Sequence, residues 1–397
     1  MKVTSALLAA LAVTTVNACG VPPTSLPRTA ARTIFRRADA KMYTLETAPG
    51  VTIEVTEEEK LAMMDNRVHF FDITEWKEAP NAMAEDLQRR IAAVPYPKTL
   101  TQKCNATKLI GKLDKERIQA TVERYSSFFN RYYMSETGRE SVEWLHDQIK
   151  AVLDAANVPG ANIRLVRHNA WVQPSIVVTL PGREARTVVV GGHADSIVSG
   201  DRNGRQPGAD DDASASATIF EALRVFLLDP RVKAGQLLNT MEFHWYAAEE
   251  AGLLGSQDIF NTYRQFNRNV VAMLQQDMTG YIGRDGRERF GLITDFTDPD
   301  LVNFMKLVID GVTNKSNLQY TDIPYEESTC GYACSDHGSA TRAGYPSTFV
   351  FETPFGNHNP YIHTINDTTD KLSYDHMIQH GKLITGYLSE LAWWPFA

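Results

Sequence analysis

The sequence has few cysteines, no excess of positive charge and no long apolar run, and each shortage excludes a class of protein. Four cysteines among 397 residues are too few for a disulfide scaffold. A net charge of −8 argues against a nucleic-acid partner. No stretch reaches about 18 uninterrupted apolar residues, so no membrane span is expected. With 43% apolar and 22% charged residues, the composition is typical of a soluble globular protein.

The N-terminus has the pattern of a secretory signal peptide. Lys2 carries a positive charge, Leu7 to Val13 are apolar, and Val16-Asn17-Ala18 forms a cleavage site of small residues. The apolar run is too short to cross a bilayer. We therefore expect residues 1–18 to be a removed signal peptide and the protein to be secreted into the extracellular space.

Residues 19–90 differ from the rest of the chain. They begin with a Pro-, Thr-, Ala- and Arg-rich stretch that has no periodicity. Met42 to Glu57 could form short strands and Glu58 to Asn66 a short helix, and the dibasic pair Arg89-Arg90 closes the region. In a secreted chain this pattern indicates a pro-segment that acts as a folding aid or inhibitor. The alternative is an ordinary N-terminal subdomain.

From Leu113 onward, strand and helix patterns alternate. Leu145, Ile149 and Val152 recur at helical spacing, whereas Thr187 to Gly191 is apolar on both faces, as in a central strand covered by helices. The expected strands are 175–180, 187–191, 238–248, 270–276, 290–294 and 347–352. The expected helices are 114–133, 137–156, 212–227, 253–266, 299–313 and 374–391. The alternation predicts that residues 91–397 form one α/β domain, with a mixed, mainly parallel central sheet and helices on both faces.

Side chains that can bind metals follow three of the expected strands. His193 comes after the strand 187–191, Glu249 and Glu250 end the next strand, and Asp277 ends the one after that. Open α/β sheets bind ligands beyond the carboxyl ends of their strands. Imidazole and carboxylate groups both suit zinc, so the sequence predicts a zinc site at this edge.

Glu249 and Glu250 are expected to have different tasks. Neighbouring side chains on an extended segment point to opposite sides. The pair therefore indicates one metal ligand and one general base. The alternative for an isolated Glu-Glu pair is a solvated strand end.

Other acidic residues extend the candidate site. Asp195 lies two residues beyond His193, on the same side, and could accept the other N–H of the imidazole ring. For a lone His-x-Asp the alternative is an ordinary surface pair. Asp210-Asp211-Asp212 precedes a helix, where N-capping needs only one of the three. Three adjacent carboxylates repel one another unless a cation is present, but the sequence alone does not choose among them.

These motifs together resemble the zinc aminopeptidases of metallopeptidase family 28, particularly secreted fungal leucine aminopeptidases, and are similar to the Vibrio aminopeptidase. The resemblance covers the chain from about residue 90 to the C-terminus. It is carried by Gly192-His193-Ala194-Asp195-Ser196, Pro207 to Ala213, Ala247-Ala248-Glu249-Glu250, Gln276-Asp277-Met278, Cys330 to His337, Ile362-His363-Thr364 and Asp367-Thr368.

The resemblance implies a zinc-dependent exopeptidase fold and two zinc ions per chain, bound by His193, Asp211, Glu250, Asp277 and His363. Asp211 would bridge the two ions and be followed by a cis peptide bond. Glu249 would activate a metal-bridging water as general base, and Tyr332 would donate to the oxyanion. The resemblance also implies a disulfide between Cys330 and Cys334.

The resemblance also suggests the substrate. A large apolar first residue such as Leu, on a peptide with a free N-terminus, would enter a pocket formed by Met278, Phe349, Phe351, Phe355 and Ile362. For Phe349 and Phe351 the alternative is ordinary core packing. We expect a monomer whose only other partner is its own pro-segment. Asn105 and Asn314 begin acceptor sequons for N-glycosylation.

Three other functions remain open. A metallo-carboxypeptidase or amidohydrolase of the same clan usually carries a separate dimerisation domain before the last histidine. Only 85 residues separate Asp277 from His363, and they already hold expected strands and a helix. Glutaminyl cyclases are related enzymes that use one zinc. A secreted binding protein on a peptidase scaffold would typically have lost metal ligands, and here all five positions are filled.

Overall fold

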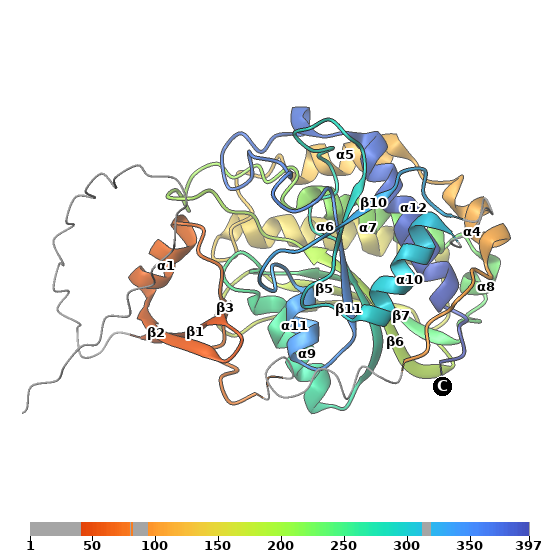
Figure 1. Ribbon diagram of the computed structural model, residues 1–397, viewed down its shortest axis with the longest axis horizontal. Coiled ribbons are helices and arrows are strands. Elements are labelled where there is room, and N and C mark those ends of the chain that lie inside the picture. Colours follow the sequence, from red (N-terminus) through yellow and green to blue (C-terminus); the bar gives the residue numbers. More distant parts are fainter. Residues whose placement is uncertain (1–40, 80, 82–93, 312–318, 397) are drawn as a thin grey trace, which may run out of the picture. The chain divides into compact units, whose positions relative to one another are not determined.

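The computed structural model describes residues 41–79, 81, 94–311 and 319–396 (Figure 1). The expected signal peptide, the pair Arg89-Arg90 and the sequon at Asn314 lie outside the described residues. Within the described residues, no helix is both long and apolar enough to cross a membrane.

Residues 41–79, called the N-terminal segment below, contain the expected short strands and helix. Three strands, β1 (Met42–Ala48), β2 (Val51–Thr56) and β3 (Phe71–Asp72), form an antiparallel sheet in the order β2-β1-β3. Helix α1 (Glu57–Asp65) begins at Thr56, whose side chain accepts the backbone N–H of Glu59. The Glu59 carboxylate accepts the Thr56 N–H in return, forming a capping box that fixes the start of the helix.

An eight-stranded sheet forms the centre of the rest of the described chain, in the order β10-β9-β11-β8-β6-β7-β5-β4. Its strands are β4 (Asn162–Val166), β5 (Ser175–Leu180), β6 (Glu184–His193), β7 (Asn239–Tyr246), β8 (Asn269–Gln275), β9 (Phe290–Ile293), β10 (Tyr325–Ser328) and β11 (Ser347–Phe351). The pairs β6–β7, β6–β8, β8–β11 and β9–β10 are parallel, whereas β4–β5, β5–β7 and β9–β11 are antiparallel. The predicted mixed, mainly parallel sheet is therefore confirmed.

Helices cover both faces of this sheet (Figure 1). Val188 and Val190 of β6 belong to the large apolar core with α5, α6, α7, α10 and α12, whereas Val189 between them packs with α9 and α11. The alternation follows from the two-residue period of a strand. The helices are α4 (Lys103–Ile110), α5 (Lys115–Tyr125), α6 (Glu136–Ala156), α7 (Ala213–Phe226), α8 (Pro230–Lys233), α9 (Leu254–Gln265), α10 (Pro299–Asp310), α11 (His337–Arg342) and α12 (Tyr374–Leu391), with a 3₁₀ turn at Thr369–Lys371.

Two expected helices end earlier than their sequence patterns indicate. The helix expected over 114–133 ends at Tyr125, because the chain beyond it turns to bury the Arg131 side chain against backbone carbonyls. The helix expected over 299–313 ends at Asp310, and Gly311 follows with a φ of 72°. Such a backbone conformation is open to glycine and closes a helix.

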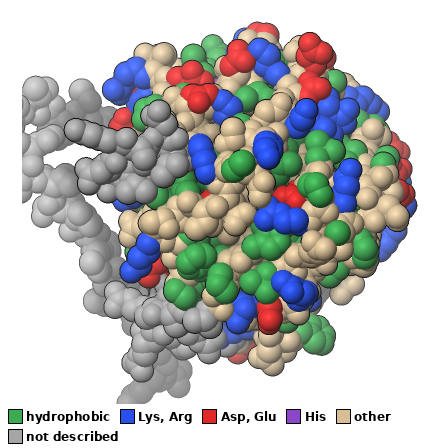
Figure 2. All heavy atoms as spheres, turned by 90° about the vertical axis from the view of Figure 1, so that its right-hand side faces the viewer, with side chains coloured by type: hydrophobic (Ala, Val, Ile, Leu, Met, Phe, Trp, Pro, Cys, Tyr) green, Lys and Arg blue, Asp and Glu red, His purple; other side chains and the backbone are tan. Residues whose placement is uncertain are grey.

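The surface carries charges of both signs. On the face shown in Figure 2, Lys and Arg side chains lie among Asp, Glu and apolar side chains. This face therefore has no broad field of one sign of the kind that binds a polyanion.

Candidate metal centre and active site

The candidate site lies where three neighbouring strands end. Strand β6 ends at His193, β7 ends at Tyr246 just before Ala247 to Glu250, and β8 ends at Gln275, two residues before Asp277. Because β8, β6 and β7 are adjacent and parallel, their carboxyl ends meet at one edge of the sheet. The metal-competent side chains that the sequence places after these strands therefore lie together.

The five predicted ligands form two groups of potential metal donors. One comprises His193, Asp211 and Asp277, and the other Asp211, Glu250 and His363, with the donor atoms of each group within 4.8 Å of one another. Nε2 of His193 lies 2.9 Å from Oδ1 of Asp211 and 3.6 Å from Oδ1 of Asp277. Nε2 of His363 lies 3.0 Å from Oδ2 of Asp211 and 3.0 Å from Oε2 of Glu250. Asp211 thus offers one oxygen to each group.

The three consecutive aspartates have different surroundings. Asp212 caps helix α7 by accepting the Ala215 N–H, and it also accepts the backbone N–H groups of His193 and Met278. Asp211 faces the two histidines. The peptide bond between these two aspartates is cis. The capping explanation therefore applies to Asp212, while Asp211 is free to bind metal.

Asp210 belongs to a buried network behind the site, which the sequence does not reveal. Its carboxylate accepts N–H groups from Gly280 and from the side chain of Asn359. Asp367 accepts the backbone N–H groups of Asp210 and Asp211, and Glu352 accepts those of Tyr281 and Asn359. The network links the loops that carry Asp211, Asp277 and His363, so it fixes the relative positions of three of the candidate ligands.

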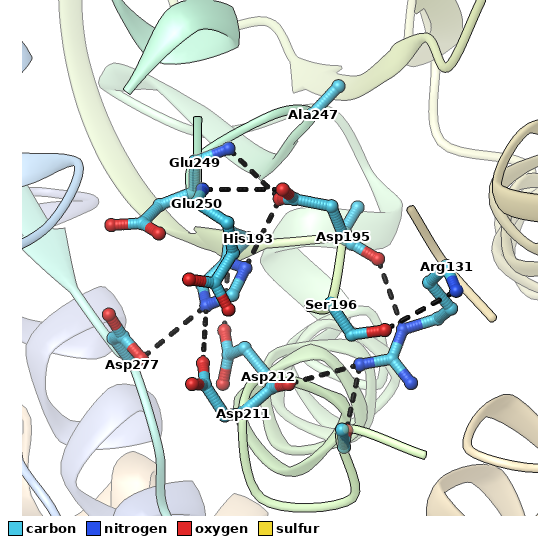
Figure 3. A network of polar contacts seen from close by, with 12 residues as sticks. Arg131, His193, Asp195, Ser196, Asp211, Asp212, Ala247, Glu249, Glu250 and Asp277 are labelled. Atoms are coloured by element: carbon cyan, nitrogen blue, oxygen red, sulfur yellow. Dashed lines mark hydrogen bonds and ion pairs between the residues drawn. The ribbon is translucent and has the colours of Figure 1, made fainter. Parts of the chain in front are cut away.

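Asp195 contacts both the histidine and the backbone of the paired glutamates (Figure 3). Its Oδ1 lies 3.3 Å from Nδ1 of His193 and accepts the Glu249 backbone N–H at 2.9 Å. Its Oδ2 accepts the Glu250 N–H at 3.3 Å. This arrangement orients the imidazole, as expected from the His-x-Asp spacing, and also anchors the loop that carries both glutamates.

Arg131 lies beside the same region, next to Ser196, and is a second residue that sequence reasoning missed (Figure 3). Its fully buried guanidinium donates to the backbone carbonyls of Ala194, Pro207 and Gly208 at 2.7–3.2 Å. It also stacks over the ring of Tyr125, with 4.7 Å between the guanidinium carbon and the ring centre. The contacts tie the segment after β6 to the segment before Asp211. The only sequence signal was an arginine inside an expected helix.

Burial dominates the electrostatics of the carboxylates. Burial raises the pKa of Glu249 well above its usual range, with Glu250 and Asp277 adding to the effect. Burial likewise raises the pKa of Glu250 to about 7, although His363 opposes it. The pKa of Asp211 is lowered against the effect of burial, because His193 and His363 both donate to it. Bound cations would favour the ionised form of every ligand.

The predicted specificity residues form one cluster. Met278, Phe349 and Phe351 are buried together with Ile293, and Phe355 and Ile362 pack against them. The Cys330–Cys334 disulfide is present and joins this cluster. Between the two cysteines, Tyr332 packs edge-on against Phe355, with 6.2 Å between ring centres. Burial, reinforced by Glu249 and Asp277, raises the pKa of Tyr332, so its hydroxyl remains a donor.

The N-terminal segment covers this region. A cavity of about 140 Å³ is lined on one side by Glu249, Glu250 and His363 and on the other by Arg67 to Phe71. The ring of His69 stacks on Tyr332 with 3.9 Å between centres, and the two share a hydrogen bond of 2.8 Å. A cavity of this size is smaller than the 300–1,000 Å³ that is usual for ligand pockets.

Two further residues, the predicted glycosylation site Asn105 and the neighbouring Cys104, lie away from the site. Asn105 is exposed on helix α4, where a glycan would face solvent. Cys104 beside it is exposed and has no disulfide partner among the described residues.

A mixed α/β sheet with two His–carboxylate donor groups at the carboxyl ends of its strands is the arrangement expected of a metal-dependent hydrolase. The family model for peptidase family M28 matches residues 175–388. The chain belongs to this family and is a peptidase, and the family together with the donor groups implies a bound metal ion.

The chain is similar to known aminopeptidases over most of its length. Leucine aminopeptidase 1 of Arthroderma otae is 46% identical over 357 residues, which cover 88% of this chain and 92% of the relative. Leucine aminopeptidase 1 of Arthroderma gypseum is 45% identical over 360 residues, covering 89% and 93%. The crystal structure of the LapA aminopeptidase of Legionella pneumophila superimposes with a TM-score of 0.73 at 29% identity, covering 86% of this chain and 90% of that chain.

Proposed function

We propose that the protein is a secreted leucine aminopeptidase that works with two zinc ions. The observation that carries the proposal is the position of Asp211, whose two oxygens lie 2.9 Å from His193 and 3.0 Å from His363. Each histidine is accompanied by its own second carboxylate, Asp277 or Glu250. A carboxylate shared between two such groups suits a pair of metal ions a few ångströms apart.

The donor atoms fit zinc. Each group offers an imidazole nitrogen and carboxylate oxygens, and three protein ligands leave a coordination position open. Oε1 of Glu250 is buried and has no hydrogen-bond partner among the described residues, so an acceptor is available to a cation or to a substrate amine. When bound, the zinc ions would lower the pKa of a water molecule and polarise the scissile carbonyl.

Glu249 is the general base in this proposal. It is partly buried beside the site but belongs to neither donor group. Its carboxylate accepts the proton of the attacking water and later delivers it to the leaving amine. Tyr332 donates to the oxyanion that develops on the scissile carbonyl. Asp195 keeps the backbone of Glu249 in place and orients the His193 ring.

The proposed pocket for the first substrate residue is the apolar cluster around Phe349 and Phe351. We expect Leu, Met and Phe ahead of Gly, Asp and Glu, by roughly 10- to 150-fold, because burying a leucine side chain contributes about 1.5–3 kcal/mol. The substrate's free α-amine would settle beside Glu250, so N-acetylated peptides should resist cleavage.

The N-terminal segment acts in this proposal as an inhibitory pro-segment. Its Glu46 forms a buried ion pair with Arg342 of α11, and Asp65 pairs with Arg202 at 2.6 Å. Cleavage near Arg89-Arg90 would leave a mature chain that begins in the low nineties. Intact-mass measurement on the active secreted protein tests this step, and retention of residues 41–79 would contradict it.

The competing functions make different predictions. Two glutaminyl cyclases have a similar fold at 15% and 18% identity, which shows the fold alone. A one-zinc cyclase or a carboxypeptidase would not release leucine from leucine amide, and a binding protein would show no turnover. The test is zinc analysis together with hydrolysis of leucine amide by the mature protein. Two zinc ions with turnover support the proposal, and turnover of N-acetylated substrates instead would contradict it.

A further inference from the structure

Residues 67–73 of the N-terminal segment cross the candidate active site in a fixed direction. The Arg67 side chain donates to the carbonyl of Ile362 at 3.2 Å, in the loop of the proposed specificity pocket. Two residues later, His69 stacks on Tyr332, which would face the scissile carbonyl. The path then reaches Gly252, which follows the paired glutamates. If His69, which faces Tyr332, takes the place of the first substrate residue, then residues 67 and 68 have no counterpart in a substrate, and the segment matches a substrate only from His69 toward Gly252.

Phe71 occupies an apolar pocket beyond Tyr332. Its ring is buried with Leu253 and Ala333, and Phe296 packs against the same cluster. Gly338 of α11 forms the floor, where an added Cβ would lie only 2.8 Å from Cζ of Phe71. The pocket is therefore shaped for an aromatic ring and depends on a glycine beneath it.

The backbone of the next residue is bound at both of its polar groups. The N–H of Asp72 donates to the Gly252 carbonyl at 3.1 Å, and its carbonyl accepts from Nε2 of Gln257 at 3.1 Å. Gly252 has a φ of 101°, and a Cβ there would lie 2.7 Å from the Asp72 nitrogen. Contacts to main-chain groups are independent of the bound sequence, so any extended peptide could make them.

We infer that this pocket is a substrate subsite of the mature enzyme, which binds an aromatic side chain at the third residue of the peptide. The inference rests on the proposed function, because the N-terminal segment must leave before a substrate can enter. In the precursor the segment fills the subsite with its own Phe71. The residue that faces Tyr332 corresponds to the first substrate residue, which places Phe71 at the third.

Other contacts of the segment have no counterpart in a short peptide. The ion pairs Glu46–Arg342 and Asp65–Arg202 use acidic side chains from β1 and α1, outside the path of residues 67–73. Arg342 itself borders the subsite, because its guanidinium carbon lies 5.8 Å from the centre of the Phe71 ring. The expected preference is therefore for an aromatic ring beside this guanidinium, together with main-chain contacts.

The test compares two tetrapeptides, Leu-Ala-Phe-Ala and Leu-Ala-Gly-Ala, on the mature enzyme isolated after secretion. We expect kcat/KM to be about tenfold or more higher for the phenylalanine peptide, as burial of a large apolar side chain implies. Moving Phe to the second or fourth residue should remove most of this gain. A ratio below two at the third position would overturn the inference.

A pair of glycine variants tests the location. Gly338→Ala should bring the ratio close to one, because the added methyl group would lie 2.8 Å from the position of the ring and 2.7 Å from Cβ of Ala333, and so would crowd the floor of the pocket. Gly111→Ala is the matched control, since its added Cβ would make only ordinary contacts at 3.6 and 3.7 Å, at the end of helix α4. An unchanged ratio in Gly338→Ala would place the binding elsewhere. If Gly338→Ala does not fold, the acetylated peptide of residues 67–75 replaces it as an inhibitor of the unmodified mature enzyme, and Phe71→Ala in that peptide should weaken inhibition about tenfold.

Leucine amide separates this inference from the proposed function. It has no third residue, so its hydrolysis by the mature enzyme depends only on the metal centre and the first-residue pocket. If leucine amide is not cleaved, the proposed function fails. If leucine amide is cleaved but the tetrapeptides show no preference, the subsite fails alone.

Discussion

Asp195 accepts the backbone N–H of Glu249 at 2.9 Å through the same oxygen that lies 3.3 Å from Nδ1 of His193. One buried carboxylate thus couples a candidate zinc ligand to the candidate base. The second oxygen accepts the N–H of Glu250. The spacing of the whole site depends on a residue that touches no metal in the proposal.

Asp195→Asn should therefore weaken the site without unfolding the chain. An amide offers one acceptor oxygen and would present an N–H₂ group to one of the backbone donors. We expect a loss of about 10- to 100-fold in zinc affinity or activity, as for other residues that orient metal ligands. Zinc titration and steady-state kinetics measure it. Asp154→Asn, on an exposed pair with Lys150, is the matched control, and equal behaviour of the two variants would refute the role.

Arg131→Met should lower the free energy of unfolding of the protein. The variant leaves the Pro207 carbonyl without a donor, whereas the Ala194 carbonyl still accepts the Tyr125 hydroxyl and the Gly208 carbonyl still accepts the Ala213 N–H. One buried carbonyl without a donor costs about 1–3 kcal/mol, so we expect a loss of that size in urea unfolding, with Arg131→Lys in between. Arg139→Met removes a surface arginine paired with Glu143 and should leave stability almost unchanged, because an exposed ion pair contributes little. Similar values for Arg131→Met and Arg139→Met would contradict the anchoring role.

His337 should make the protein sensitive to acid. Burial lowers its pKa to about 3, and neither ring nitrogen has a hydrogen-bond partner among the described residues. An unfolded histidine titrates near 6.5, so between pH 6.5 and 3 only the unfolded chain gains this proton. The neutral His337 ring therefore makes its full contribution to the free energy of unfolding above pH 6.5. Below that pH the contribution falls by about 1.4 kcal/mol per pH unit. His337→Leu should flatten the stability profile over this window, measured by denaturant unfolding at fixed zinc; parallel profiles would be inconsistent with a neutral buried ring.

The cysteines make a simple count possible. Cys330 and Cys334 are joined, and Cys104 is exposed without a partner among the described residues. A mature chain that has lost residues 1–90 should therefore show one free thiol when denatured without reductant. Three thiols would mean that the disulfide does not form in the secreted protein.

Much of the fold could be predicted because burial leaves a periodic trace in the sequence. Strand β6 is apolar on both faces, and Val188, Val189 and Val190 indeed pack alternately into two cores. Helix α12 has the bounds that its apolar spacing indicates. The sequence also predicted that His193, Glu250 and Asp277 lie at one edge of the sheet. They do so because they follow adjacent parallel strands, which end together. The roles of these residues remain proposals.

The supporting residues could not be predicted because their contacts are long-range and made largely with the backbone. Arg131 binds carbonyls more than 60 positions away, which no local pattern encodes. Asp210 joins Asn359 across 149 positions. The position of His69 on Tyr332 likewise depends on how the N-terminal segment folds back. Periodicity reports which face of an element is buried, but it does not report the partner.

The central claim is that Glu249 is the general base and Glu250 is a zinc ligand. Replacing each residue in turn tests this claim most directly. Glu249→Ala removes a proton acceptor but no ligand, so both zinc ions should remain while kcat falls by about 10²–10⁴. Glu250→Ala removes a ligand, so zinc content and thermal stability should fall together. The measurement is zinc analysis on both purified variants beside steady-state kinetics with leucine amide. Loss of zinc from Glu249→Ala with both ions retained in Glu250→Ala would contradict the assignment.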